Sequence, residues 1–67
     1  MADITKAVAE RSVTFTANTP RADPWMKQRF GSHTITFDTT VPAQRERAIA
    51  LEAEALALMP LLRIETL

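Results

Sequence analysis

The chain contains no cysteine and no tyrosine, and it has one glycine among its 67 residues. The lack of cysteine excludes disulfide bonds and thiolate metal sites. One glycine cannot form a Gly-rich phosphate-binding loop. The single histidine, His33, cannot hold a metal ion alone. We therefore expect no cofactor and no metal centre, and a small core that depends on close packing or on a partner chain.

Neither sign of charge is in excess, because eight basic residues balance eight acidic ones. Whole-chain charge therefore does not favour nucleic acid or an anionic membrane. No stretch approaches the roughly 20 apolar residues of a membrane span, and the first residues do not resemble a secretory signal. With 46% hydrophobic residues, the composition predicts a single globular domain over 1–67. We expect it in the cytoplasm, or in the host cytoplasm if the protein is viral.

No group of residues predicts catalysis. Ser32 and His33 precede Asp38 closely in sequence, but Ser32 does not lie on a strained strand-to-helix turn. Glu52 and Glu54 are two apart on a predicted helix, so they point about 200° from each other and cannot share a substrate proton. The sequence predicts that the protein is not an enzyme.

Alternation of apolar and polar residues predicts three strands, over 12–17, 33–38 and 61–67. In the first of them Val13 and Phe15 point to one face while threonines point to the other. These outward positions are uncharged, and a short sheet without charged side chains has edges that accept another strand.

An alanine- and leucine-rich segment, 41–59, predicts one long helix, with Pro42 in its first turn and Pro60 after its end. Its apolar residues form two stripes. One stripe is needed to cover the sheet, and the other either broadens the core contact or is an exposed patch for a partner. The stripes are Ala48, Leu51, Ala55, Leu58 and Met59, and Ile49, Ala53 and Leu56.

This order of elements predicts the α+β class, as a two-layer β-β-α-β domain with a three-stranded, mostly antiparallel sheet packed on one long helix. The N-terminal segment, 1–11, allows a short helix, because Asp3 suits an N-cap and Ile4 and Val8 would share a face. The other interpretation of this segment is a frayed tail.

Residues 18–32 are predicted to be a long loop rich in basic and aromatic residues, with a net charge of +2. Within it Pro24 could open a short helical turn that Gly31 ends. Tryptophan and arginine dominate many interaction hot spots, and the same mixture could stack bases and contact phosphates. Alternatively, the apolar side chains close the core and the cations form its rim. Two arginines near the start of the long helix could join this surface, so the candidate binding residues are Arg21, Trp25, Lys27, Arg29, Phe30, Arg45 and Arg47.

These features predict a small non-enzymatic protein-binding module. No family motif is present, but the β-β-α-β order over 12–67 resembles that of several small phage-encoded proteins that inhibit host enzymes, including a phage inhibitor of host RNA polymerase. The resemblance implies an inhibitor that occupies a surface of a larger host complex, and it assigns no functional residue. The alternatives are a nucleic-acid-binding protein that uses the 18–32 loop and the helix N-terminus, and a small subunit of a larger assembly. A homodimer through the helix or a sheet edge is a further prediction.

Overall fold

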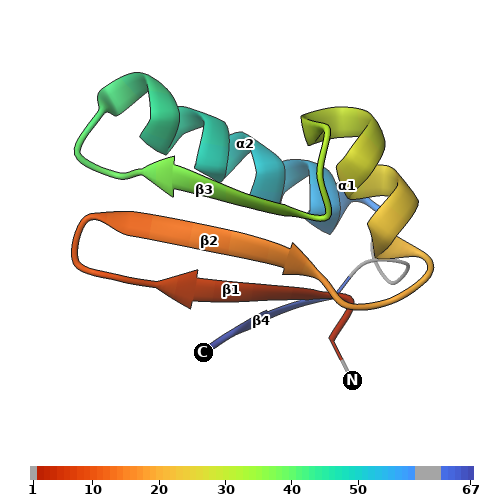
Figure 1. Ribbon diagram of the computed structural model, residues 1–67. Coiled ribbons are helices and arrows are strands. Elements are labelled where there is room, and N and C mark those ends of the chain that lie inside the picture. The colour runs from red at the N-terminus through yellow and green to blue at the C-terminus, as the bar shows by residue number, and fades with distance from the viewer. Residues whose placement is uncertain (1, 59–62) are drawn as a thin grey trace.

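The computed structural model describes residues 2–58 and 63–67 (Figure 1). The described chain forms six elements in the order β-β-α-β-α-β, which confirms the α+β class. It has four strands and two helices, where the sequence predicts three strands and one helix. The elements are β1 (Ile4–Val8), β2 (Ser12–Ala17), α1 (Ala22–Phe30), β3 (Thr34–Asp38), α2 (Pro42–Ala57) and β4 (Ile64–Thr66).

The sheet has the strand order β3-β2-β1-β4 and is mixed. β2 pairs antiparallel with both β1 and β3, and β1 pairs in parallel with β4. The two strands predicted over 12–17 and 33–38 are confirmed, with Val13 opposite Phe37 in their register. The last strand is shorter than predicted, and residues 61 and 62 of the predicted 61–67 strand lie outside the described residues.

The prediction of a short N-terminal helix is wrong, because this segment forms β1. Ile4 stands opposite Ala17 of β2 and beside Ile64 of β4, so β1 hydrogen-bonds to a neighbour on each side. An isolated helix of one or two turns is marginal in water. Pairing within the sheet supplies the backbone bonds and also buries Ile4 completely, which explains why the strand is preferred.

The prediction of a long loop over 18–32 is also wrong, because most of this segment forms α1. Pro24 falls in the first turn of this helix, where its missing N–H breaks no helical hydrogen bond. The predicted end at Gly31 is confirmed: this residue has a φ of 82°, and its N–H donates to the Lys27 carbonyl oxygen over 2.8 Å. Only glycine enters this left-handed conformation without strain.

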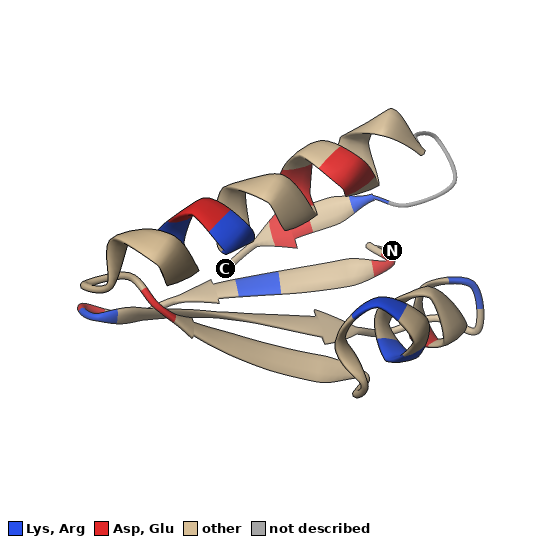
Figure 2. Cartoon of the chain, turned by 90° about the horizontal axis from the view of Figure 1, so that it is seen from above, with Lys and Arg blue, Asp and Glu red and all other residues tan. Residues whose placement is uncertain are grey.

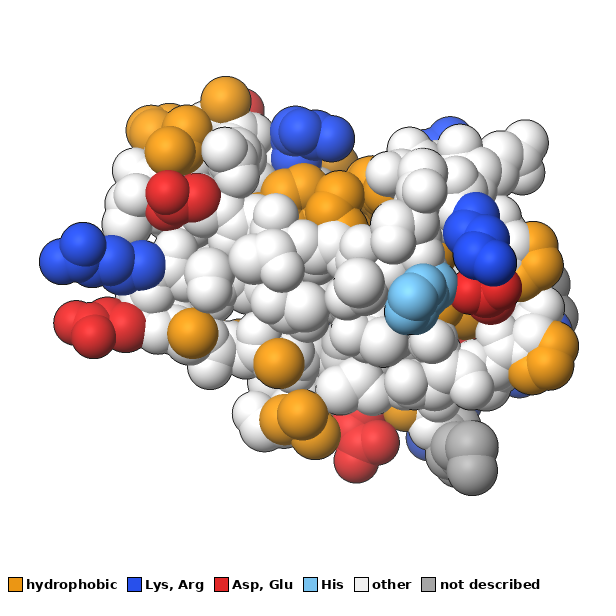
Figure 3. Space-filling view, viewed as in Figure 1, with side chains coloured by type: hydrophobic (Ala, Val, Ile, Leu, Met, Phe, Trp, Pro, Cys, Tyr) orange, Lys and Arg blue, Asp and Glu red, His pale blue; other side chains and the backbone are white. Residues whose placement is uncertain are grey.

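Figures 1 and 2 show α2 running along one face of the sheet and α1 at one end of it. The opposite face carries threonines that pair through their hydroxyl groups. Thr14 Oγ1 lies 2.9 Å from Thr36 Oγ1, and Thr16 Oγ1 lies 3.1 Å from Thr34 Oγ1. The space-filling view of this face shows its middle free of acidic and basic side chains (Figure 3).

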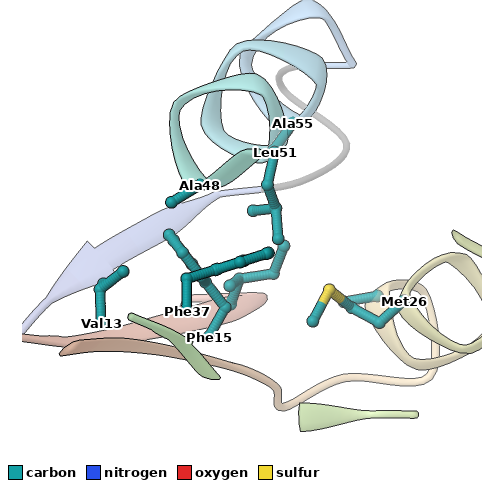
Figure 4. Packing of buried hydrophobic residues seen from close by; sticks show 9 residues of the cluster. Val13, Phe15, Met26, Phe37, Ala48, Leu51 and Ala55 are labelled. Carbon is teal, nitrogen blue, oxygen red and sulfur yellow. The ribbon is translucent and has the colours of Figure 1, made fainter. Parts of the chain in front are cut away.

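The core lies between the sheet and α2 (Figure 4). Phe15 and Phe37 meet edge to face with their ring centroids 6.1 Å apart, and Leu51 of α2 lies above them, fully buried. Met26 of α1 closes one end of this cluster and is also fully buried. The buried apolar residues are Ile4, Val13, Phe15, Ala22, Met26, Phe37, Ala48, Leu51 and Ala55.

The long helix is confirmed in place and ends two residues earlier than the predicted 41–59. Met59 of its first stripe lies outside the described residues. The second stripe does not broaden the core, since Ile49 and Leu56 keep about 60% of their surface exposed. Neither α1 nor α2 has the length and continuous apolar sequence needed to cross a membrane. The buried residues of α2 all belong to the first stripe and are Ala48, Leu51 and Ala55.

Candidate protein-binding surfaces

Arg21 is held at the start of α1 by the carboxylate of Asp3. Its Nη2 lies 3.3 Å from both Asp3 carboxylate oxygens. Thr19 Oγ1 donates to the same carboxylate over 2.7 Å, and the Arg63 backbone N–H donates over 3.0 Å. These contacts, with the Thr19 hydroxyl contributing most, lower the pKa of Asp3. The Asp3 carboxylate thus joins the segments that begin β1, α1 and β4.

The two other cations of the 18–32 segment also have acidic partners within the chain. Lys27 Nζ lies 3.1 Å from Asp23 Oδ2, one helical turn earlier in α1. Arg29 forms an ion pair with Glu54 of α2, which bridges the two helices. The side chain of Arg29 nevertheless keeps 47% of its surface exposed, so it remains within reach of another molecule.

Trp25 and Phe30 take an intermediate position between core and surface. Both are half-buried and pack against the core. Their rings meet edge to face with centroids 6.1 Å apart, and Phe30 meets Phe37 in the same way at 6.2 Å. The interpretation that these aromatic residues close the core is therefore correct for their inner edges. Their remaining surface lies in a groove.

This interhelical groove runs between α1 and α2. It consists of two adjoining hollows of about 390 and 420 Å³ that share Gln28, Arg29 and Glu54 as lining residues. The Arg29–Glu54 ion pair therefore stands where they meet. The lining residues are Trp25, Gln28, Arg29, Phe30, Arg47, Ala50, Leu51, Glu54, Ala57 and Leu58.

The two ends of the interhelical groove differ in chemistry. At one end the Arg47 guanidinium stacks over the Phe37 ring, 5.5 Å from its centroid, and among the described residues it has no acidic partner. At the other end Trp25 and Leu58, which is 38% exposed, line the same hollow. Since Arg29 and Glu54 neutralise each other, Arg47 gives the groove a net positive charge.

Arg45 lies on the opposite flank of α2 from Arg47, because two positions along a helix correspond to a rotation of about 200°. It lines a separate hollow of about 180 Å³ together with Ile49 and Glu52. The seven candidate residues are thus divided. The interhelical groove gathers Trp25, Arg29, Phe30 and Arg47, whereas Arg21, Lys27 and Arg45 do not line it.

A second surface, which we call the α2 apolar face, covers the solvent side of the second half of α2. It includes the second stripe that the sequence predicts, together with two more alanines. The two acidic residues in this half of α2 form ion pairs at its sides, Glu52 with Lys6 and Glu54 with Arg29. The face consists of Ile49, Ala53 and Leu56, with Ala50 and Ala57 at its border, where they also line the interhelical groove; all five are exposed.

Sequence reasoning misses Gln28, Glu54 and Leu58 as groove residues. In the sequence Glu54 is indistinguishable from an ordinary solvated helix charge, because Arg29 comes close to it only through helix α1, which the sequence does not predict.

Among the described residues no three histidine, aspartate or glutamate side chains gather closely enough to hold a metal ion. Comparisons with protein-family models, with curated proteins and with solved structures found no match.

Proposed function

We propose that the chain is a non-enzymatic protein-binding module whose interhelical groove accepts an acidic and apolar segment of another protein. One observation carries the proposal. Two half-buried aromatic rings and two exposed arginines line the two adjoining hollows of the groove between α1 and α2: Trp25, Phe30, Arg29 and Arg47. Aromatic and arginine side chains in partly enclosed positions are the usual anchors of protein interfaces.

The chemistry of the groove specifies the segment. The positive end at Arg47 favours a carboxylate, which a guanidinium can bind through two parallel hydrogen bonds. The apolar end at Trp25 and Leu58 favours a large aliphatic or aromatic side chain. Arg47 and Leu58 are about 16 Å apart along the helix axis at about 1.5 Å per residue. An extended peptide covers that distance in about five residues, so we expect an acidic residue four or five positions from a large apolar one.

A nucleic-acid partner has less support. That hypothesis uses the cations of residues 18–32 together with Arg45 and Arg47 as one patch. Arg45 and Arg47 lie on opposite flanks of α2, and the three cations of the 18–32 segment have acidic partners. A gel-shift series at low salt discriminates the two functions, because phosphate contacts bind most tightly there.

A phage-encoded inhibitor stays a prediction from the sequence and adds nothing to this proposal. Its basis is a resemblance in element order, β-β-α-β over 12–67, and α1 interrupts that order between β2 and β3. A role as a small subunit of a larger assembly would use the same groove, with the partner segment supplied by a neighbouring subunit.

The proposal can be tested without choosing a partner in advance, by selecting peptides that bind the chain from a displayed library of random sequences. We expect enriched peptides to carry an aspartate or glutamate four or five positions from a large apolar residue. We also expect them to bind the Arg45→Glu variant as well as the natural chain and to lose binding to Arg47→Glu. Enrichment of basic peptides, or of none, would contradict the proposal.

A further inference from the structure

We propose that the flank of α2 that faces away from the interhelical groove pairs, antiparallel, with the same flank of a second copy of this chain. The inference does not depend on the proposed function, because the two surfaces lie on opposite sides of α2. It starts from three exposed aliphatic side chains. Val41, at the N-cap of α2, is 38% exposed, Ile49 is 60% exposed and Leu56 is 61% exposed.

These side chains follow the spacing of a helix-pairing seam. Positions 45, 49, 52 and 56 are separated by four, three and four residues, the alternation that keeps one seam facing a partner helix. Position 41 lies one turn before position 45. The alanine at 53 stands beside this seam and lets another helix approach closely. The seam therefore reads Val41, Arg45, Ile49, Glu52, Leu56.

Charge complementarity identifies the occupant as a second copy. The seam carries one cation, Arg45, and one anion, Glu52, placed symmetrically about the midpoint between residues 48 and 49. An antiparallel pair with its twofold axis at that midpoint puts Arg45 of each copy opposite Glu52 of the other. Val41 and Leu56 are symmetric about the same midpoint, so they also face each other, and the two Ile49 side chains meet beside the axis.

The surroundings of Glu52 fit this role. Lys6 Nζ lies 2.5 Å from Glu52 Oε1 and fixes the direction of the carboxylate, so Oε2 is the atom that Arg45 of the second copy would approach. Val8, 60% exposed on β1, lies in the same hollow as Arg45 and Ile49 and extends the apolar contact. A pair of helices buries a small interface, below about 1,200 Å², for which we expect a transient dimer.

Sedimentation equilibrium of three proteins tests the pairing: the natural chain, Arg45→Glu, and Glu52→Arg. We expect the natural chain to dimerise as its concentration rises from micromolar to millimolar. Each variant alone places like charges across the seam and should remain a monomer. In an equimolar mixture of the two variants, the introduced glutamate faces the introduced arginine, and the natural Glu52 of one chain faces the natural Arg45 of the other. The mixture should therefore form a one-to-one dimer.

A natural chain that stays monomeric over this range, or an Arg45→Glu variant that dimerises as well as the natural chain, would overturn the proposal. Glu52→Arg also removes the Lys6 ion pair, so its folding is checked by circular dichroism. If it does not fold, Ile49→Asp takes its place and must abolish the dimer. Arg47→Glu is the matched control, with the same charge change on the opposite flank, and must leave the dimer intact.

Discussion

Lys6 of β1 and Glu52 of α2 form an ion pair, with Nζ 2.5 Å from Oε1. Lys6 stands opposite Phe15 and so belongs to the face of the sheet that α2 covers. A basic side chain is tolerated there because its ammonium group meets a carboxylate at the rim of the core, while its aliphatic stem covers apolar surface.

A double-mutant cycle on Lys6→Ala and Glu52→Ala measures this interaction. Both side chains are about a quarter to a third exposed, so we expect a coupling free energy of about 0.5–1 kcal/mol. Added salt should reduce it, since the pair is partly solvated. The Lys27–Asp23 pair in α1 is more exposed and serves as the control, with an expected coupling of about 0.3–0.5 kcal/mol. Equal coupling free energies in the two cycles would contradict the expectation that the less exposed Lys6–Glu52 pair is the stronger one.

Acid should destabilise the protein partly through Asp3. The hydrogen bonds from Thr19 and Arg63, and then the Arg21 charge, hold the pKa of Asp3 below the ordinary value of about 3.9. The unfolded chain therefore binds a proton more readily than the folded one. This carboxylate stabilises the fold above that ordinary value, and the contribution is lost as pH falls through the lowered, folded-state pKa.

Asp3→Asn tests that contribution by thermal unfolding over a pH series. We expect a lower Tm than the natural chain at neutral pH and a difference that narrows below about pH 3.9. Asp38 also has a lowered pKa, because the Thr40 hydroxyl and backbone N–H bind its carboxylate, so part of the acid dependence should survive in Asp3→Asn. A difference in Tm that stays constant at all pH values would show that the negative charge of Asp3 does not contribute to stability.

Gly31→Ala should destabilise the chain by about 1 kcal/mol, because alanine is strained at the φ of 82° that ends α1. Apart from its chain neighbours, a Cβ at this position would meet no atom within 4 Å, so the cost is that of the backbone alone. Gly31→Asn should cost less, since asparagine enters the left-handed region more easily. Chemical denaturation measures both variants, and equal losses would contradict a backbone cause.

The parts of the fold that the sequence predicts are those where alternation or helical spacing is uninterrupted. β2 and β3 alternate cleanly, and α2 combines a long apolar spacing with Pro42 in its first turn. In β1 the positions that face α2 are Ile4, Lys6 and Val8. The lysine interrupts the alternation of apolar and polar residues, so the sequence pattern favours a short helix over a strand. Its partner Glu52 is 46 positions away in sequence, and no local pattern reveals the pairing.

The sequence predicts which residue types form the candidate site, but it predicts only in part which of these residues lie together. The composition of the 18–32 segment points to its tryptophan, phenylalanine and arginines, but a loop gives no direction to their side chains. Helix α1 places Trp25 and Arg29 one turn apart beside α2. Arg45 and Arg47, which the sequence groups in one patch, line different hollows, because their spacing of two on a helix separates them by about 200°.

Calorimetric titration of a library-selected acidic peptide into three proteins tests the groove most directly. The proteins are the natural chain, Arg47→Glu in the groove, and Arg45→Glu on the opposite flank, at a concentration where all are monomers. A charged hydrogen bond is worth about 1.5–3 kcal/mol, so Arg47→Glu should weaken binding by roughly tenfold to a hundredfold. Arg45→Glu should bind as the natural chain does. Equal affinities for all three proteins, or equal losses in both variants, would contradict a binding site between α1 and α2.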